Sequence, residues 1–170
     1  CGPIGLMAIP VCHMAGAAFV AASDVSEQRL ALARRLGADL VVNAKTEDVP
    51  ARIREGNGGQ GIDVVLEMSG HPDGLHDGLR ALRNGGWVSL LGLPTGPVPI
   101  DIANDVIFKE ARLTGIFGRK MWQTWEQVTA LLRSGLDVTP VITHRLPVDR
   151  FEEAFELLRS GSAGKVILYL

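Results

Sequence analysis

The chain has 170 residues, of which 46% are hydrophobic and 21% are charged, and its formal net charge is −2. This length allows one domain of ordinary size, or one domain with part of another, and the apolar content predicts a buried core. The small net charge argues against non-specific nucleic-acid binding, and no apolar run approaches the roughly 20 residues of a membrane-spanning helix. Two cysteines, Cys1 and Cys12, without a C-x-x-C motif fit a reducing compartment, so we expect a cytoplasmic protein.

The first 24 residues contain part of a dinucleotide-binding motif. Gly2 and Gly5 have the spacing of the last two glycines of G-x-G-x-x-G, and Asp24 follows Gly5 by 19 residues. In this motif one glycine admits a pyrophosphate, the next lets the helix pack on its strand, and the acidic residue binds the ribose hydroxyls. A helix beginning at Pro3 would present its N–H groups to the same anion. The first glycine of the motif is not in the sequence, so the G-x-x-G is a weak signal by itself.

The segments that follow alternate between helix and strand patterns. Pro3–Met14 is predicted to be a buried helix with a kink at Pro10, and residues 17–22 form an apolar strand. An amphipathic helix over 26–36 places Arg29 on its inward side. The same patterns predict strands over 40–42, 62–68, 87–91 and 111–117, and helices over 47–55, 72–82 and 103–108. Strands separated by helices of about ten residues predict β-α-β units and a parallel sheet.

Ligands of such a sheet bind at the carboxyl ends of its strands. Those ends carry Asp24, Asn43, the run 67–70 and the run 91–94. The small residues of the last two runs suit a close approach of the backbone to a flat ligand. The order of elements and the motif together therefore predict a dinucleotide-binding α/β domain.

The pattern changes after residue 118. One face of a helix carries Met121, Trp125, Val128 and Leu132, and residues 141–148 alternate as a half-exposed strand does. An amphipathic helix that begins near residue 151 and a closing strand over 165–169 complete the chain.

Several runs of residues resemble the medium-chain, zinc-dependent alcohol dehydrogenase superfamily, and the resemblance covers the whole chain. General features of the superfamily are residues 2–5, Asp24, 37–39 and 84–92. Within it the chain resembles the L-threonine 3-dehydrogenases, through the runs 66–70, 106–109, 115–119, 142–146 and 159–168. The resemblance implies oxidation of L-threonine to L-2-amino-3-oxobutanoate with NAD⁺ as hydride acceptor.

The resemblance also implies two groups of cofactor-binding residues. Those on the pyrophosphate and adenosine side are Gly2, Pro3, Ile4, Gly5, Asp24 and Arg29. Those on the nicotinamide side are Leu91, Gly92, Leu93, Ile116 and Phe117. A carboxylate at Asp24 repels a 2′-phosphate, which predicts a preference for NAD⁺ over NADP⁺.

The implied fold is a Rossmann doubly wound parallel sheet in three αβα layers over 1–118, without its first strand, so that the sheet has an unpaired centre. Residues 119–170 are expected to return to a GroES-like catalytic domain that this sequence lacks. The zinc ligands and proton-relay residues of the superfamily belong to that domain, so we predict no catalytic and no metal-binding residue in this chain. Alone, the chain is expected to bind NAD⁺ weakly and to oxidise nothing. The exposed edge of the strand over 111–117 favours a dimer or tetramer.

Four histidines and one arginine are the other candidates for chemistry. His13 beside Cys12, and His71 and His76 five residues apart, lack the spacing that places two metal ligands on one helical face. His144 is interpreted as structural, and Arg119 as a contact to the cofactor or to a neighbouring subunit. Two other functions stay open: a dehydrogenase for a polyol such as sorbitol or for another secondary alcohol, and a non-catalytic module that senses a dinucleotide.

Overall fold

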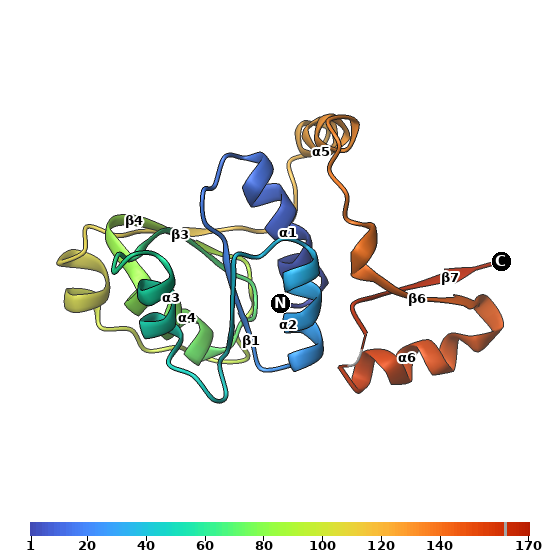
Figure 1. Ribbon diagram of the computed structural model, residues 1–170, viewed down its shortest axis with the longest axis horizontal. Helices are drawn as coiled ribbons and strands as arrows, with labels where there is room; N and C mark the ends of the chain where they lie inside the picture. Colours follow the sequence, from blue (N-terminus) through green and yellow to red (C-terminus); the bar gives the residue numbers. More distant parts are fainter. Residues whose placement is uncertain (162) are drawn as a thin grey trace. The chain divides into compact units, whose positions relative to one another are not determined.

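The computed structural model describes residues 1–161 and 163–170, which form two compact units (Figure 1). Unit 1 comprises residues 1–43 and 120–170, and unit 2 comprises residues 44–119. Helices and strands alternate in both units, and each strand pair is parallel. The chain is therefore an α/β protein, as the sequence predicts. The division into a nucleotide domain over 1–118 and a return segment over 119–170 stays a prediction.

The first half of unit 1 is a strand pair covered by two helices. Its elements are α1 (Pro3–Met14), β1 (Ala21–Asp24), α2 (Glu27–Arg35) and β2 (Leu40–Asn43). β1 lies parallel to β2, with Ala21 opposite Leu40 and Asp24 opposite Asn43. Helix α1 continues through Pro10, although proline removes one backbone donor there. Buried side chains of both helices and of β1 form one core with Val141.

Strand β1 begins four residues later than the apolar run predicts. The amide of Val20 donates to Asp39 Oδ2 at 2.7 Å, and the carbonyl of Val20 accepts from the amides of Asp39 and Leu40. These bonds tie Val20 to the turn before β2 instead of to a neighbouring strand. The predicted strand over 17–22 was therefore wrong for residues 17–20.

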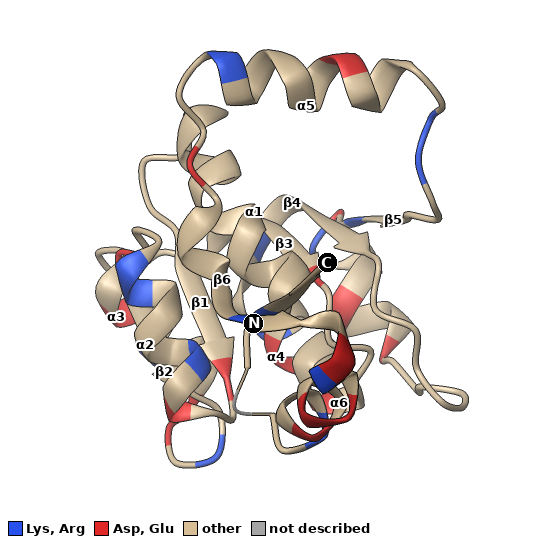
Figure 2. Ribbon diagram, turned by 90° about the vertical axis from the view of Figure 1, so that its right-hand side faces the viewer, with Lys and Arg blue, Asp and Glu red and all other residues tan. Residues whose placement is uncertain are grey.

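The second half of unit 1 contains a second strand pair. Its elements are α5 (Gln123–Arg133), η2 (Thr139–Val141), β6 (Ile142–Pro147), η3 (Val148–Arg150), α6 (Phe151–Arg159) and β7 (Lys165–Tyr169). β6 and β7 are parallel, and α6 contacts both strands (Figure 1). Figure 2 shows that α5 carries few charged residues, in contrast to the acidic α6.

Unit 2 is a three-stranded parallel sheet with the order β3-β4-β5. Its elements are α3 (Val49–Gly56), β3 (Ile62–Glu67), α4 (Pro72–Ala81), β4 (Leu82–Leu90), the π-helical turn η1 (Ile102–Ile107) and β5 (Arg112–Gly115). Val65, Leu79, Leu82 and Val88 form its buried core. β5 pairs with β4 on one side, which confirms that this strand lies at an edge of the sheet. β4 begins directly after α4, five residues earlier than predicted.

The strand orders of the two units agree with a Rossmann-like fold. A doubly wound sheet has the order 3-2-1-4-5-6. The pair β1-β2 corresponds to strands 2 and 3 of that order, and β3-β4-β5 corresponds to strands 4, 5 and 6. In the described part of the chain, no helix is both long and apolar enough for a membrane span.

Candidate functional site

The start of α1 is shaped to receive an anion. Gly2 is the N-cap residue with an extended backbone, and Pro3 occupies the first helical position, where a missing N–H costs nothing. Within the described residues no side chain caps this helix, and its first turn holds no acidic residue. A Cβ atom on Gly2 would meet nothing within 4 Å. Among the described residues, no capping or acidic side chain therefore occupies the start of this helix.

Asp24 ends β1 next to this helix start. Its Oδ2 lies 2.5 Å from the nitrogen of Cys1 and 3.7 Å from Nη1 of Arg29. Its Oδ1 accepts a hydrogen bond of 2.9 Å from the amide of Ser26. The carboxylate is only 7% exposed, and Figure 2 shows the acidic end of β1. The structure thus brings the glycine turn, Asp24 and Arg29 together within unit 1.

Two opposing effects act on the pKa of Asp24. Burial raises the pKa of this carboxyl, because the charged form loses water. Hydrogen bonds from the Cys1 nitrogen and the Ser26 amide, and the charge of the Arg29 guanidinium, lower it, and these attractive effects prevail. The net pKa is below the ordinary value of 3.8, so Asp24 is ionised at neutral pH. An ionised carboxylate accepts hydrogen bonds from ribose hydroxyls and repels a phosphate.

Arg29 offers a donor that the protein does not use. Its Nε is buried, and no atom of the described residues accepts a hydrogen bond from it. A buried donor without an acceptor costs about 1–3 kcal/mol. An acceptor on a ligand beside Asp24 would remove that cost, so this donor fits a nucleotide on the adenosine side.

The predicted nicotinamide group lies in unit 2, at the carboxyl ends of β4 and β5. The amides of Leu91 and Gly92 donate to the carbonyl of Glu67 at 2.9 and 3.0 Å, and the amide of Ile116 donates to the carbonyl of Leu90 at 2.8 Å. The side chains of Leu93 and Phe117 are 80% and 95% exposed. A fixed backbone with exposed apolar side chains can cover one face of a flat aromatic ring.

The glycines of this group are held by close packing. A Cβ on Gly92 would lie 2.1 Å from the amide nitrogen of Gly70 and 2.5 Å from Oε2 of Glu67. A Cβ on Gly70 would lie 2.5 Å from the carbonyl oxygen of Leu93, and Gly70 has a φ of +69°. The loops after β3 and β4 therefore touch backbone to backbone, and only glycine allows this approach.

Glu67 is the residue of this region that the sequence-based site omits. It ends β3 and is 6% exposed. Its Oε1 accepts from the amide and the hydroxyl of Ser69, at 2.8 and 2.5 Å, and from the amide of Gly70 at 3.1 Å. An acidic residue at the end of an apolar strand, just before a Ser-Gly turn, is the signal in the sequence that points to it.

The remaining candidates make local contacts. The His13 ring nitrogens face the carbonyls of Ala17 and Gly37, and Nε2 of His76 lies 2.8 Å from the carbonyl of Pro99. His71 caps α4 through Nδ1, and His144 Nδ1 lies 2.8 Å from the Thr143 hydroxyl. Over residues 1–161 and 163–170, no three His, Cys, Asp or Glu side chains are grouped so as to hold a metal ion. The described residues therefore offer no zinc site.

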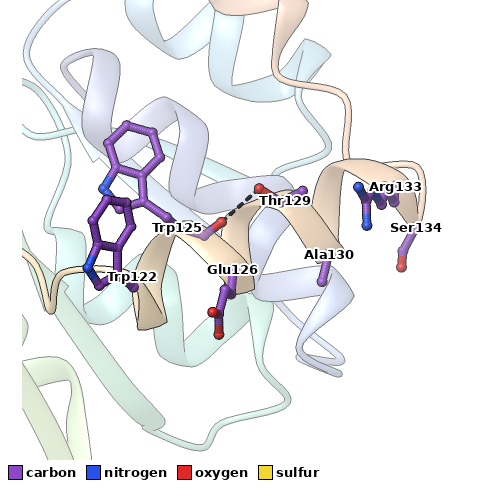
Figure 3. Close-up of a pocket in the computed structure, with 7 residues that line it drawn as sticks. All are labelled: Trp122, Trp125, Glu126, Thr129, Ala130, Arg133 and Ser134. Atoms are coloured by element: carbon purple, nitrogen blue, oxygen red, sulfur yellow. Dashed lines mark hydrogen bonds between the residues drawn. The ribbon is translucent and has the colours of Figure 1, made fainter.

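A shallow hollow lies along α5, and none of the predicted cofactor-binding residues lines it. Figure 3 shows its lining, which includes Trp122, Trp125 and Glu126 at one end and Arg133 at the other. Its lining comes from a single helix and the residues at its two ends, and the only dashed contact is the bond from the Thr129 hydroxyl to the Trp125 carbonyl. This arrangement provides an apolar surface but no pair of groups for acid–base chemistry.

Comparisons with known proteins show the family to which the chain belongs. The sequence profile described as zinc-binding dehydrogenase matches residues 3–134. The chain is 53% identical over 169 residues to L-threonine 3-dehydrogenase of Bacillus velezensis, covering 99% of this chain and 49% of that protein. It is 50% identical over 170 residues to the L-threonine 3-dehydrogenase of Symbiobacterium thermophilum, covering 99% and 48%. The chain thus spans about half the length of the curated relatives it matches.

Solved structures show the same fold. An alcohol dehydrogenase of Thermotoga maritima superposes with a TM-score of 0.87 at 34% identity, covering 99% of this chain and 47% of that one. The 2R,3R-butanediol dehydrogenase of Bacillus subtilis superposes with a TM-score of 0.88 at 29% identity, covering 100% and 49%.

Proposed function

This chain belongs to the zinc-binding dehydrogenase family, and we propose that it is the coenzyme-binding part of an NAD-dependent L-threonine 3-dehydrogenase. The observation that carries the coenzyme assignment is the ionised carboxylate of Asp24, buried at the end of β1 beside the start of α1 and the unused donor of Arg29. That arrangement fits a ribose with free 2′- and 3′-hydroxyls.

The chain's own residues would bind and orient the coenzyme. The first turn of α1 would hold the pyrophosphate, and Ile4, which is exposed, would pack against it. Leu91, Gly92 and Leu93 would line the nicotinamide half, together with Ile116 and Phe117. Bound NAD⁺ supplies the hydride acceptor. Zinc and its ligands are assigned to the part of the dehydrogenase that this chain does not contain.

The substrate proposal depends on sequence similarity. Relatives about half identical to this chain are L-threonine 3-dehydrogenases. A structural neighbour that acts on a diol, the 2R,3R-butanediol dehydrogenase, is 29% identical. This gap in identity favours L-threonine over a polyol or another secondary alcohol. A purely regulatory dinucleotide module is disfavoured by the same relatives.

Two measurements test the proposal. Calorimetric titration of the 170-residue chain should detect weak NAD⁺ binding and weaker NADP⁺ binding; equal binding of both, or of neither, would refute the coenzyme assignment. The gene product that carries this sequence should form NADH with L-threonine faster than with sorbitol or 2,3-butanediol. The reverse order would refute the substrate. The isolated chain should form no NADH with L-threonine, and measurable activity would contradict the division of roles proposed above.

We also propose that the enzyme is a cytoplasmic dimer or tetramer. The free state of Cys1 and Cys12 supports a reducing compartment. The open edge of β5 supports pairing with a second copy. Analytical ultracentrifugation of the gene product tests the oligomer.

A further inference from the structure

We propose that the buried carboxylate of Glu67 biases the site toward the oxidised coenzyme, so that it strengthens binding of NAD⁺ relative to NADH. Glu67 would act through its charge, from behind the backbone that lines the nicotinamide, without touching the coenzyme. This inference rests on the proposed function, because it requires that the nicotinamide lie against Leu91 and Gly92.

Glu67 accepts hydrogen bonds from neutral groups: the amide and hydroxyl of Ser69 and the amide of Gly70. In the described part of the chain, no lysine, arginine or histidine pairs with it. The Ser69 hydroxyl donates to Oε1 at 2.5 Å and accepts from the His71 amide at 3.0 Å, which fixes the direction of both bonds. Glu67 thus acts only as an acceptor in these bonds, and none of its hydrogen-bond partners is a cation.

The carboxylate of Glu67 lies directly against the backbone at Gly92. Oε2 lies within 2.5 Å of the position that a Cβ on Gly92 would occupy. The carbonyl of Glu67 accepts hydrogen bonds from the amides of both Leu91 and Gly92. A ligand against the open side of this backbone would therefore lie one backbone layer away from a buried charge, in a region where little water screens it.

The two coenzyme forms differ in the charge of the nicotinamide ring. The nicotinamide ring of NAD⁺ carries a positive charge, and the ring of NADH carries none. The rest of the two molecules is the same. At an effective dielectric constant between about 20 and 40, a fixed negative charge at a separation of about 7–8 Å would favour the cationic ring by roughly five- to fiftyfold.

Glu67 also shapes the turn between β3 and α4, and a structural role alone has a different signature. Loosening the turn would weaken NAD⁺ and NADH by the same factor, because both forms contact the same backbone. Only a charge effect changes the ratio of the two dissociation constants. That ratio is the quantity to measure.

The test compares Glu67→Gln with the wild-type chain. Glutamine keeps Oε1 as an acceptor for Ser69 and Gly70 and removes the charge. NAD⁺ affinity is measured by calorimetry and NADH affinity by coenzyme fluorescence. We expect the NADH-to-NAD⁺ ratio of dissociation constants to fall about fivefold or more. Asp73→Asn, which makes the same charge change at an exposed position of α4, should leave the ratio unchanged.

A second variant keeps the inference testable if Glu67→Gln does not fold. Ser69→Ala removes one hydrogen-bond donor to the carboxylate of Glu67 and retains the charge of that carboxylate. The removed hydroxyl dipole no longer offsets part of the negative charge, so the NADH-to-NAD⁺ ratio of dissociation constants should rise about twofold. An unchanged ratio in the folded variants, with both forms still bound, would overturn the role of Glu67 and leave the proposed function standing. A wild-type chain that binds neither NAD⁺ nor NADH would overturn the proposed function instead.

Discussion

Two buried carboxylates, one in each unit, end a parallel strand. Asp24 ends β1 and meets the backbone nitrogen of Cys1 and the charged guanidinium of Arg29. Glu67 ends β3 and meets neutral donors of Ser69 and Gly70. Both carboxylates are largely removed from water: the side chain of Asp24 is 7% exposed, and Glu67 as a whole residue is 6% exposed. Burial alone therefore does not decide the role of a carboxylate at a strand end. The charge of Asp24 is partly neutralised by Arg29, and its oxygens can accept hydrogen bonds from ribose hydroxyls. The hydrogen-bond donors to Glu67 are neutral groups, and we propose that its charge acts on the coenzyme at longer range.

The largest expected effect comes from closing the space beside Glu67. In Gly92→Ala, the new methyl group would lie 2.1 Å from a backbone nitrogen and 2.5 Å from Oε2 of Glu67. Backbone cannot yield as a flexible side chain does, so we expect a loss of about 1–3 kcal/mol or more in the free energy of unfolding. NAD⁺ binding should be lost with it. Urea unfolding and calorimetry measure the two effects.

Gly96→Ala is the matched control, because a Cβ there meets nothing within 4 Å. Its stability should equal that of the wild type within about 0.5 kcal/mol. If Gly92→Ala were as stable as Gly96→Ala, the close contact between the β3 and β4 loops would be refuted.

The second prediction separates the two carboxylates by their effect on coenzyme choice. Asp24→Asn removes the charged acceptor for the ribose, and hydrogen bonds to charged groups contribute about 1.5–3 kcal/mol. NAD⁺ affinity should fall at least about tenfold, while NADP⁺ affinity should hold or improve because the repulsion of the 2′-phosphate is gone. Titration with both coenzymes measures this.

Glu67→Gln is the natural comparison for Asp24→Asn. It should leave the discrimination between NAD⁺ and NADP⁺ in place, because Glu67 belongs to the nicotinamide side. Equal loss of that discrimination in both variants would show that the two carboxylates do not have separate roles.

The sequence predicted a role for Asp24 but none for Glu67. The reason is that Asp24 belongs to a local sequence motif, whereas the contacts of Glu67 join residues that are distant in the sequence. The position of Asp24 follows from a local motif, the glycine spacing and the strand between them. The role of Glu67 depends on the register that places it opposite Leu90 and on the loop contact between Gly70 and Gly92. The start of β1 was wrong for a similar reason, since Asp39, 19 residues away, takes the amide of Val20. Periodicity predicts elements well but does not contain such distant side-chain contacts.

The third prediction concerns stability away from both carboxylates. Lys109 Nζ donates to the carbonyls of Leu79 and Leu82, at 2.5 and 3.1 Å, near the amino end of β4. Burial lowers the pKa of this ammonium. Lys109→Met leaves two carbonyls without this donor, so the free energy of unfolding should fall by about 1–3 kcal/mol. The exposed Lys120→Met is the control. The NADH-to-NAD⁺ ratio should not change in either variant. Both variants remove one positive charge, so a changed ratio in Lys109→Met alone would count against Glu67 as the group that sets the ratio.

The smallest expected effect is the acid dependence of Asp24. The pKa of this carboxyl in the folded chain is below its ordinary value of 3.8, so the folded state holds the proton less tightly than the unfolded state. The stabilisation is therefore complete above about pH 4 and is lost as the pH falls through the lower folded pKa.

Asp101 and Asp137 also have lowered pKa values because of hydrogen bonds from Asn104 and Thr139, so the wild-type curve contains their contributions. Asp24→Asn retains those two carboxyls. The difference in unfolding free energy between the wild type and Asp24→Asn should shrink as the pH is lowered from about 6 to below about 3. A difference in unfolding free energy that stays constant over this pH range would mean that the charge of Asp24 does not stabilise the folded chain, and that only the hydrogen bonds of its side chain do.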